Sequence, residues 1–296
     1  DNDGDMDYVL GNFGTNGFLK PSEQFLIRAY AKDFDNNGSF DALFSTYLPS
    51  GIDETIKEYP IASRDELIKE MSMMKERFPN YASYARAEMK NIFSEQELTG
   101  ALQLSVNSFQ SCWIENRGNF QFVLHTLPPQ AQWAPLYGMV TNDFDGDGNM
   151  DILLNGNEFS MAPPLGRYDA LNGLLLKGDG KGNFSPLSLL ESGIYIPGNG
   201  KALIQLVSNN KLTIAAAQNA SWLKCFQSRH QNNKIIPLLP DDAFAMVALK
   251  NGRRRKEEFG FGSSFLSQSG RFIMLNPSIQ SVEIVNNKKQ KRVIAN

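Results

Sequence analysis

The chain has 296 residues and a formal net charge of −3 at pH 7. A chain of this length can bury a large core and can form one large or two ordinary domains. The slight acidic balance argues against a general nucleic-acid binder, and no apolar run approaches the ~20 residues that a membrane-spanning helix needs. We therefore expect a folded protein with neither a nucleic-acid partner nor a transmembrane segment.

The first acidic segment precedes the apolar run Tyr8–Leu10, which is short enough for a strand. Its carboxylates occupy every second position: Asp1, Asp3, Asp5 and Asp7. When Asp7 is aligned with the last aspartate of the two loops described below, the first ligand position falls upstream of Asp1. We expect these four residues to hold a metal, and we expect the natural protein to extend further towards its N-terminus.

A second acidic loop lies between two predicted strands, Phe25–Tyr30 and Ala42–Leu48. Its candidate ligands again occupy alternate positions: Asp33, Asp35, Asn37, Ser39 and Asp41. Asn37 stands where the third carboxylate would be. The sequence therefore predicts the order strand, acidic loop, strand.

Residues 63–105 change to a helical pattern. Ser63-Arg64-Asp65-Glu66 has the form of a capping box, and apolar residues then recur at helical spacing as far as Phe78. A second helix is expected over residues 81–93, and a short third helix should include Leu98 and Leu102. The methionine and aromatic stripe predicts a packing face. We interpret this segment as a helical insertion.

The third acidic loop is the most complete. Its candidate ligands are four carboxylates and one asparagine that can offer its backbone carbonyl: Asp143, Asp145, Asp147, Asn149 and Asp151. Such oxygen atoms suit Ca²⁺, and without a cation the carboxylates would repel one another. An EF-hand is excluded because the twelfth position is Leu154 instead of Glu, and because the run Ile152–Leu154 predicts a strand where an EF-hand has a helix.

The stretch from Phe109 to Phe184 repeats short strands, Gly/Asn turns and an acidic loop. Strands are predicted at Ser111–Glu115, Phe120–Leu124 and Leu174–Leu176. Repeats of ~40–60 residues built from four short antiparallel strands are typical of propeller blades. Residues 201–226 add two strands without an acidic loop, which indicates a blade without metal.

The C-terminal part begins with a predicted hairpin. Phe244–Leu249 leads into the turn Asn251-Gly252. The basic run that follows, Arg253–Lys256, is interpreted as a solvated strand edge, because basic residues often guard exposed edges. Binding of a polyanion is the alternative.

The residues that carry a family resemblance are the loops Asp33–Asp41 and Asp143–Asp151 and the turn Gly11–Gly14. They resemble the FG-GAP/VCBS-type calcium-binding repeats of integrin alpha subunits and of many secreted bacterial proteins. The stretch Gly252–Glu258 with Gly262–Ser269 resembles the ASPIC/UnbV domain that follows such repeats in cartilage acidic protein-like chains. The resemblance implies a mainly β fold with β-propeller-like blades of the integrin alpha N-terminal type and Ca²⁺ as cofactor.

Three acidic loops are fewer than a complete propeller needs, so we expect an incomplete propeller that an upstream segment or another chain completes. We assign propeller blades with calcium loops to residues 1–62, the helical insertion to 63–105, further blades to 106–236 and an ASPIC/UnbV-like β segment to 237–296. Weak calcium sites, with a Kd of ~10⁻⁴ to 10⁻³ M, suit an extracellular, periplasmic or cell-surface protein.

The sequence offers few groups for catalysis. His125 and His230 are its two histidines; His125 has no orienting partner near it in the sequence, and we expect His230 to lie in an exposed loop. The motifs of serine hydrolases, zinc proteases and phosphate-binding loops do not occur. Cys112 and Cys225 are expected to be independent buried thiols, with one disulfide as the alternative.

Two loop clusters join aromatic and charged side chains, as carbohydrate and peptide sites often do: Trp133 and Tyr137, and Arg167, Tyr168 and Asp169. The last three can equally anchor their own loop. Our first hypothesis is an extracytoplasmic interaction module that binds protein or carbohydrate and uses Ca²⁺ structurally. The alternative is a Ca²⁺-dependent enzyme acting on polysaccharide, with Arg167, Tyr168 and Asp169 near its site.

Overall fold

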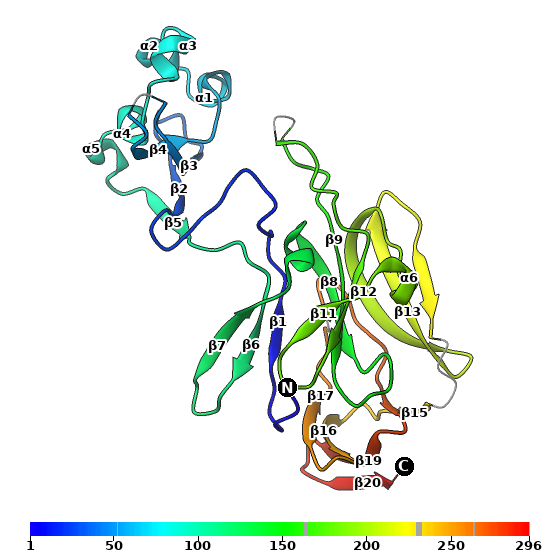
Figure 1. The fold of residues 1–296 in the computed structure, drawn as a ribbon. Helices are drawn as coiled ribbons and strands as arrows, with labels where there is room; N and C mark the ends of the chain where they lie inside the picture. The colour runs from blue at the N-terminus through cyan, green and yellow to red at the C-terminus, as the bar shows by residue number, and fades with distance from the viewer. Residues whose placement is uncertain (52, 163–164, 229–232, 263, 296) are drawn as a thin grey trace. The chain divides into compact units, whose positions relative to one another are not determined.

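The chain divides into two compact units in a computed structural model. Unit 1 comprises Asp1–Asn16 and Gln110–Asn296, and unit 2 comprises Gly17–Phe109, so unit 2 interrupts the sequence of unit 1. Strands hold 42% of the residues and helices 11%, which confirms the predicted mainly β class (Figure 1). The structure describes residues 1–51, 53–162, 165–228, 233–262 and 264–295.

Unit 2 contains one antiparallel sheet with the order β4-β3-β2-β5. Its strands are β2 (Ile27–Lys32), β3 (Asp41–Pro49), β4 (Ile56–Pro60) and β5 (Leu102–Val106). Side chains of β3 alternate between buried and exposed at its start, which places Leu43 in the core. The second acidic loop connects β2 to β3, so the predicted order of strand, acidic loop and strand is confirmed.

The helices of unit 2 are α1 (Arg64–Glu70), α2 (Met74–Arg77), α3 (Tyr81–Tyr84), α4 (Met89–Ile92) and α5 (Glu95–Leu98). The predicted capping box is present, because Ser63 accepts from the N–H of Glu66 and Glu66 accepts from the N–H of Ser63. The apolar stripe is a packing face, as predicted: Leu67, Met71 and Ile92 are fully buried in one cluster with Leu43.

The helix lengths differ from the prediction. Five short helices replace the three expected, because Met71 and Glu88 adopt extended backbone conformations and interrupt the two longer ones. The expectation that Leu102 belongs to a helix is wrong. Gly100 has a left-handed φ of 80° and Leu102 then pairs with Ala31 of β2.

Unit 1 contains several antiparallel sheets. The first has the order β1-β6-β7, with β1 (Tyr8–Leu10), β6 (Cys112–Asn116) and β7 (Phe122–Thr126). The second has the order β11-β10-β9-β8, with β8 (Leu136–Asn142), β9 (Asp151–Gly156), β10 (Leu174–Gly178) and β11 (Phe184–Pro186). The third has the order β12-β13-β14, with β12 (Asn199–Ser208), β13 (Lys211–Asn219) and β14 (Lys224–Gln227).

Two sheets form the C-terminal part of unit 1. One pairs β15 (Lys234–Pro237) with β18 (Phe272–Leu275). The other has the order β17-β16-β19-β20, with β16 (Asp242–Leu249), β17 (Arg254–Glu258), β19 (Ile279–Asn286) and β20 (Lys291–Ala295). Unit 1 also has the short helices η1 (Pro129–Gln132) and α6 (Leu189–Ser192).

Strand β9 lies at the centre of unit 1, and each of its six residues is buried. Ile152 and Leu154 pack in one core cluster with Trp113, whereas Leu153 packs on the other side with Leu203. Because both faces are covered, β9 has a continuous apolar run instead of an alternating one.

None of the sheets in the described part of the chain is closed. Sheets of consecutive antiparallel strands, such as β8 to β11, have the strand order that a propeller blade requires. The assignment of these sheets to blades stays a prediction. Of the helices that the structure describes, none is long and apolar enough to cross a membrane.

Candidate metal centre

The third acidic loop connects β8 to β9 and gathers three carboxylates. One oxygen from each of Asp143, Asp145 and Asp151 lies within 4.8 Å of an oxygen from the other two. Gly146 and Gly148 permit this arrangement because the loop backbone needs left-handed φ values of 82° and 94° at these positions. The three carboxylates therefore face a common point.

Asp143 is 1% exposed. Its carboxylate accepts hydrogen bonds from the N–H groups of Gly146 and Gly148, both at 2.8 Å, and from the side-chain amide of Asn276. Burial raises the pKa of Asp143, although these donors and the charge of Arg255 oppose the rise. A nearby cation would stabilise the ionised form of this carboxyl group.

Asp151 is 2% exposed and ties the loop to the neighbouring strand. It accepts from the N–H groups of Phe144 and Gly178, both at 2.9 Å, and Gly178 ends β10. Burial raises the pKa of Asp151 to about 7, and repulsion by Asp145 and Asp143 adds to the rise.

We expect the binding of a cation to this loop to weaken below pH 7. The pKa of Asp151 in the metal-free fold, about 7, exceeds the unfolded value of ~3.9. Between these two pH values the folded chain keeps a proton that the unfolded chain has lost, so the fold loses stability as the pH rises. A cation such as Ca²⁺ would need the ionised form, and its binding would release that proton. Titration calorimetry in buffers of different ionisation enthalpy should detect the release of about one proton per chain at pH ~5.5 and almost none at pH ~8.5. Equal proton release at the two pH values would contradict this expectation.

Lys177 supplies a positive charge beside the same loop. Its ammonium group pairs with Asp145 and lies 3.1 Å from Asp147. Asp147 therefore faces Lys177 and does not join the group of three carboxylates, and it accepts from the N–H of Asn149 at 2.8 Å. Of the predicted ligands, Asp147 is thus outside the group of three carboxylates, and the role of the Asn149 backbone carbonyl stays a prediction.

The second acidic loop has the same arrangement in unit 2. Asp33, Asp35 and Asp41 offer carboxylate oxygens within 4.8 Å of one another. The side chain of Asn37 accepts from the N–H of Ser39 at 2.8 Å, as Asp147 does from Asn149. This loop thus gathers the same three positions as the third loop.

The two loops share several hydrogen bonds at matching positions. The N–H of the second residue donates to the ninth, as Phe34 does to Asp41 and Phe144 to Asp151. The N–H of the sixth residue donates to the first, as Gly38 does to Asp33 and Gly148 to Asp143. Both loops also lead into strands, which confirms that neither is an EF-hand.

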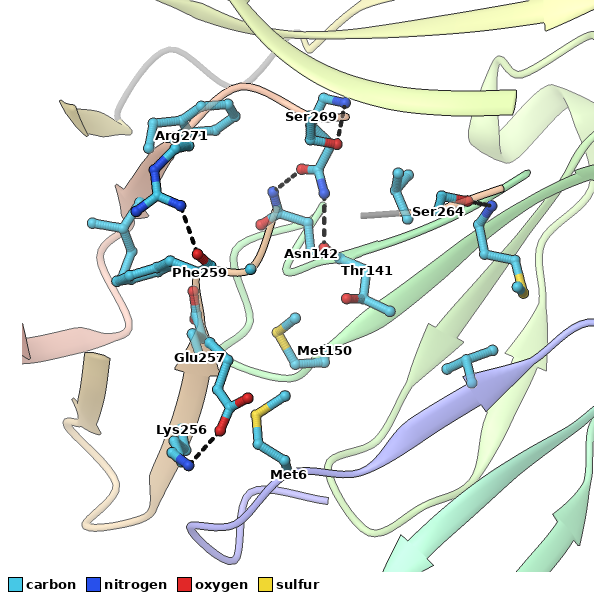
Figure 2. Close-up of a pocket in the computed structure, with 18 of the residues that line it drawn as sticks. Met6, Thr141, Asn142, Met150, Lys256, Glu257, Phe259, Ser264, Ser269 and Arg271 are labelled. Carbon is cyan, nitrogen blue, oxygen red and sulfur yellow. Dashed lines mark hydrogen bonds and ion pairs between the residues drawn. The ribbon is translucent and has the colours of Figure 1, made fainter. Parts of the chain in front are cut away.

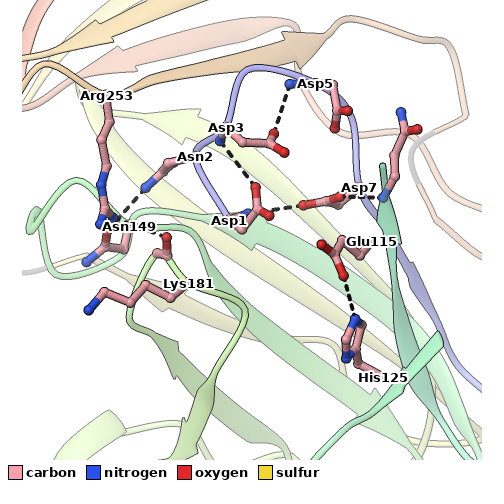
Figure 3. A network of polar contacts seen from close by, with 12 residues as sticks. Asp1, Asn2, Asp3, Asp5, Asp7, Glu115, His125, Asn149, Lys181 and Arg253 are labelled. Carbon is pink, nitrogen blue, oxygen red and sulfur yellow. Dashed lines mark hydrogen bonds and ion pairs between the residues drawn. The ribbon is translucent and has the colours of Figure 1, made fainter. Parts of the chain in front are cut away.

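The first acidic segment repeats part of this pattern (Figure 3). The N–H of Asp3 donates to Asp1 and that of Asp5 to Asp3, both at 3.2 Å. Asp7 accepts from the N–H of Asn116 and from the amino group of Asp1, both at 3.0 Å. Among the described residues, the carboxylates of this segment do not form a group like those of the other two loops.

The first and third acidic loops lie side by side in unit 1. The side chain of Asn2 donates to Asn149 at 3.2 Å (Figure 3). Arg255 donates to the carbonyl of Gly148 at 3.0 Å and is 6% exposed. The expectation of a solvated basic edge is therefore wrong for Arg255, although β17 is an edge strand.

The predicted ligand residues Tyr137 and Tyr168 meet at Glu158. The hydroxyl of Tyr137 donates to Glu158 at 2.7 Å, and the ammonium of Lys201 lies 3.7 Å from the ring centroid of Tyr137. Burial, together with Glu158, raises the pKa of Tyr137 to about 12. Tyr168 pairs with Glu158 through the backbone, is 8% exposed and packs edge-on against Phe13. These contacts fit the role of loop anchor for Tyr168.

The other three predicted ligand residues are exposed. Trp133 is 45% exposed, the guanidinium of Arg167 lies 5.0 Å over the ring of Phe159, and Asp169 is at the surface. None of the five is among the residues that line the groove beside Met6–Leu10 (Figure 2) or the groove beside Leu187 and Ile194. Pro163 and Pro164 of the same loop lie outside the described residues.

His125 has an orienting partner, contrary to the expectation from the sequence. Its ring nitrogen lies 2.8 Å from Glu115, and its ring stacks on Trp113. The hairpin of β6 and β7 brings these residues together, whereas His230 lies outside the described residues. Cys112 and Cys225 are both free, as predicted, but Cys225 is exposed instead of buried.

Comparison of the chain with profiles of known protein families and with curated protein sequences finds no match. The family resemblance of the acidic loops therefore stays a prediction.

Proposed function

We propose that this chain is an extracytoplasmic calcium-binding module of the β-propeller type, in which Ca²⁺ is structural and the folded surface binds a protein or carbohydrate partner. One observation carries the proposal. Two acidic loops, one in each unit, gather carboxylates from the same three positions and have several hydrogen bonds in common. The resemblance to FG-GAP/VCBS repeats and the β-rich fold support it.

The donor set fits Ca²⁺. All candidate ligands offer oxygen, which hard divalent cations prefer, and two oxygens bound on opposite sides of Ca²⁺ lie ~4.6–5.2 Å apart. The carboxylate oxygens of each group lie within 4.8 Å of one another, close enough for one cation to contact all three. Calcium would supply the charge that the buried Asp143 and Asp151 need.

A structural role follows from what the loops connect. Asp151 begins β9 and accepts from Gly178 of β10, so an ion bound to Asp151 would hold two neighbouring strands in register. Metal binding would then be coupled to folding. Calcium concentrations outside the cytoplasm suit weak sites of this type, which supports an extracellular, periplasmic or cell-surface location.

The polysaccharide-active enzyme gains no support from the residues first considered for it. Tyr168 is packed against Phe13, and Arg167 lies over Phe159. The interaction module is therefore the function that we propose.

Native mass spectrometry of the chain in millimolar calcium tests the metal assignment. We expect two bound calcium ions per chain, because two loops gather three carboxylates each. The double variant Asp35→Asn/Asp145→Asn should bind none, and the control Asp169→Asn should still bind two. A chain that binds no calcium under these conditions would overturn the proposal.

A further inference from the structure

Lys177 lies in β10 with its ammonium group against the third acidic loop. Strand β10 pairs with β9 so that Leu176 lies opposite Ile152, and the next residue, Lys177, lies beside the start of β9. Its ammonium pairs with Asp145 and lies 3.1 Å from Asp147, and its side chain is 43% exposed. The antiparallel pairing of the two strands therefore determines where this positive charge lies.

Both carboxylate oxygens of Asp145 already have hydrogen-bond donors. Oδ1 accepts from the N–H of Asp147 at 3.2 Å, and Oδ2 accepts from the ammonium of Lys177. Asp145 is also one of the three carboxylates that face a common point, so a cation bound there would lie close to the ammonium group. Because two positive charges at short range repel each other, calcium and Lys177 compete for Asp145.

The second acidic loop differs in this respect. Asp35 holds the same loop position as Asp145 and accepts the equivalent N–H, that of Asn37, at 3.2 Å. Lys32 directly precedes this loop, but its ammonium donates to backbone carbonyls at the end of α5. Among the described residues, no ion pair joins a basic side chain to any of the three carboxylates that this loop gathers.

The lysine balances the one carboxylate that the third loop has in addition. With four carboxylates and Lys177, the third loop has a formal charge of −3 (−4 + 1). The second loop has three carboxylates and the neutral Asn37 in place of Asp147, which also gives −3. Of the two loops, the one with the additional carboxylate thus has the basic partner, and this partner contacts that carboxylate.

A groove of about 560 Å³ gives the lysine side chain room to move away from the loop. Lys177 and Asp145 both line this groove, together with Leu175, Leu187 and Glu191. The leucines can pack against the methylene groups of the lysine, and Glu191 is a further carboxylate for its ammonium. Lys177 can therefore change rotamer while the backbone of β10 stays paired.

We propose that Lys177 is a built-in competitor of calcium at the third loop and thereby sets the calcium affinity of this site. Its ammonium holds Asp145 and Asp147 until calcium displaces it and takes over these carboxylates. The second loop binds calcium without displacing a cation. The inference deepens the proposed function, on which it rests for the identity of the metal, and it names the residue that determines the affinity of one site.

Calcium titration calorimetry of the full chain tests the competition. All samples carry Asp35→Asn, which removes a ligand of the second loop and leaves the third loop to be measured alone. Lys177→Met keeps an apolar side chain of similar length and removes the charge. Its Kd for calcium should be about tenfold lower at ~0.01 M ionic strength, because the doubly charged ion no longer meets an ammonium group. The difference should shrink at ~1 M salt, which screens exposed charges.

Two further variants separate competition from other effects. Lys177→Arg keeps the positive charge and should bind calcium no more tightly than the parent chain. Lys291→Met removes a lysine from an exposed ion pair with Glu283 and should leave the Kd unchanged. In excess EDTA, Lys177→Met should unfold at nearly the same temperature as the parent, because exposed ion pairs contribute little to stability. A lysine that merely supported the loop would lose calcium affinity when substituted.

An unchanged or weaker calcium affinity of Lys177→Met would overturn the inference, as would a Lys177→Arg variant that binds as tightly as Lys177→Met. Native mass spectrometry counts the calcium in the same samples. One bound ion per chain with an affinity that does not respond to Lys177→Met would defeat this inference and leave the metal assignment intact. A chain that binds no calcium would defeat both.

Discussion

Asp145→Asn is expected to unfold like the unmodified chain in excess EDTA and at a clearly lower temperature in millimolar calcium. The substitution keeps the acceptor for the N–H of Asp147 and removes one ligand charge. It also removes the pair with Lys177, which is exposed and therefore worth little. The variant thus separates the effect of calcium from the effect of the loop hydrogen bonds.

The size of the effect follows from mass action. A site with a Kd of ~10⁻⁴ M in ~10 mM calcium stabilises the fold by ~2.7 kcal/mol. In a unit of ~200 residues this corresponds to a melting temperature higher by ~5–10 °C. Thermal unfolding followed by circular dichroism measures this rise in melting temperature. The control Asp169→Asn should show the same rise with calcium as the unmodified chain. If calcium raised the melting temperature of Asp145→Asn as much as that of the unmodified chain, calcium would act at another site.

Leu154→Ala should destabilise unit 1 by ~2–5 kcal/mol, because it opens a cavity in a packed interior. Leu154 is fully buried in the cluster that joins the first two sheets of unit 1. A fall in melting temperature of ~4–20 °C is expected for a unit of ~200 residues.

Leu190→Ala is the matched control, because Leu190 is 97% exposed. The same chemical change at this position should shift the melting temperature little. Equal effects of the two substitutions would mean that β9 is not at the centre of the core.

Much of the fold was predictable because its signals are local. Alternating and continuous apolar runs marked β3 and β9, and the carboxylates at loop positions one, three and nine were found by their spacing. The breaks in the predicted helices at Met71 and Glu88 could not be predicted from the sequence. Packing and capping fix the extended backbone at these residues, and apolar periodicity does not report it.

The partners of the acidic loops were missed because they are distant in the sequence. Lys177 lies 32 residues from Asp145, and Asn276 lies 133 residues from Asp143. No local sequence pattern predicts such contacts. The pair of His125 and Glu115 could have been found, since a hairpin with Trp113 opposite His125 brings Glu115 within reach.

The position of unit 2 in the chain determines the delay between the synthesis of β1 and the synthesis of β6. Leu10 of β1 pairs with Cys112 of β6, and 102 residues separate them (112 − 10). At a ribosomal rate of ~5–20 residues per second, β6 follows β1 by ~5–20 s, while all of unit 2 emerges. During that interval the edge of β1 that later pairs with β6 is a template for aggregation. The four aspartates immediately before Tyr8 would then act as gatekeepers that keep the nascent strand in solution.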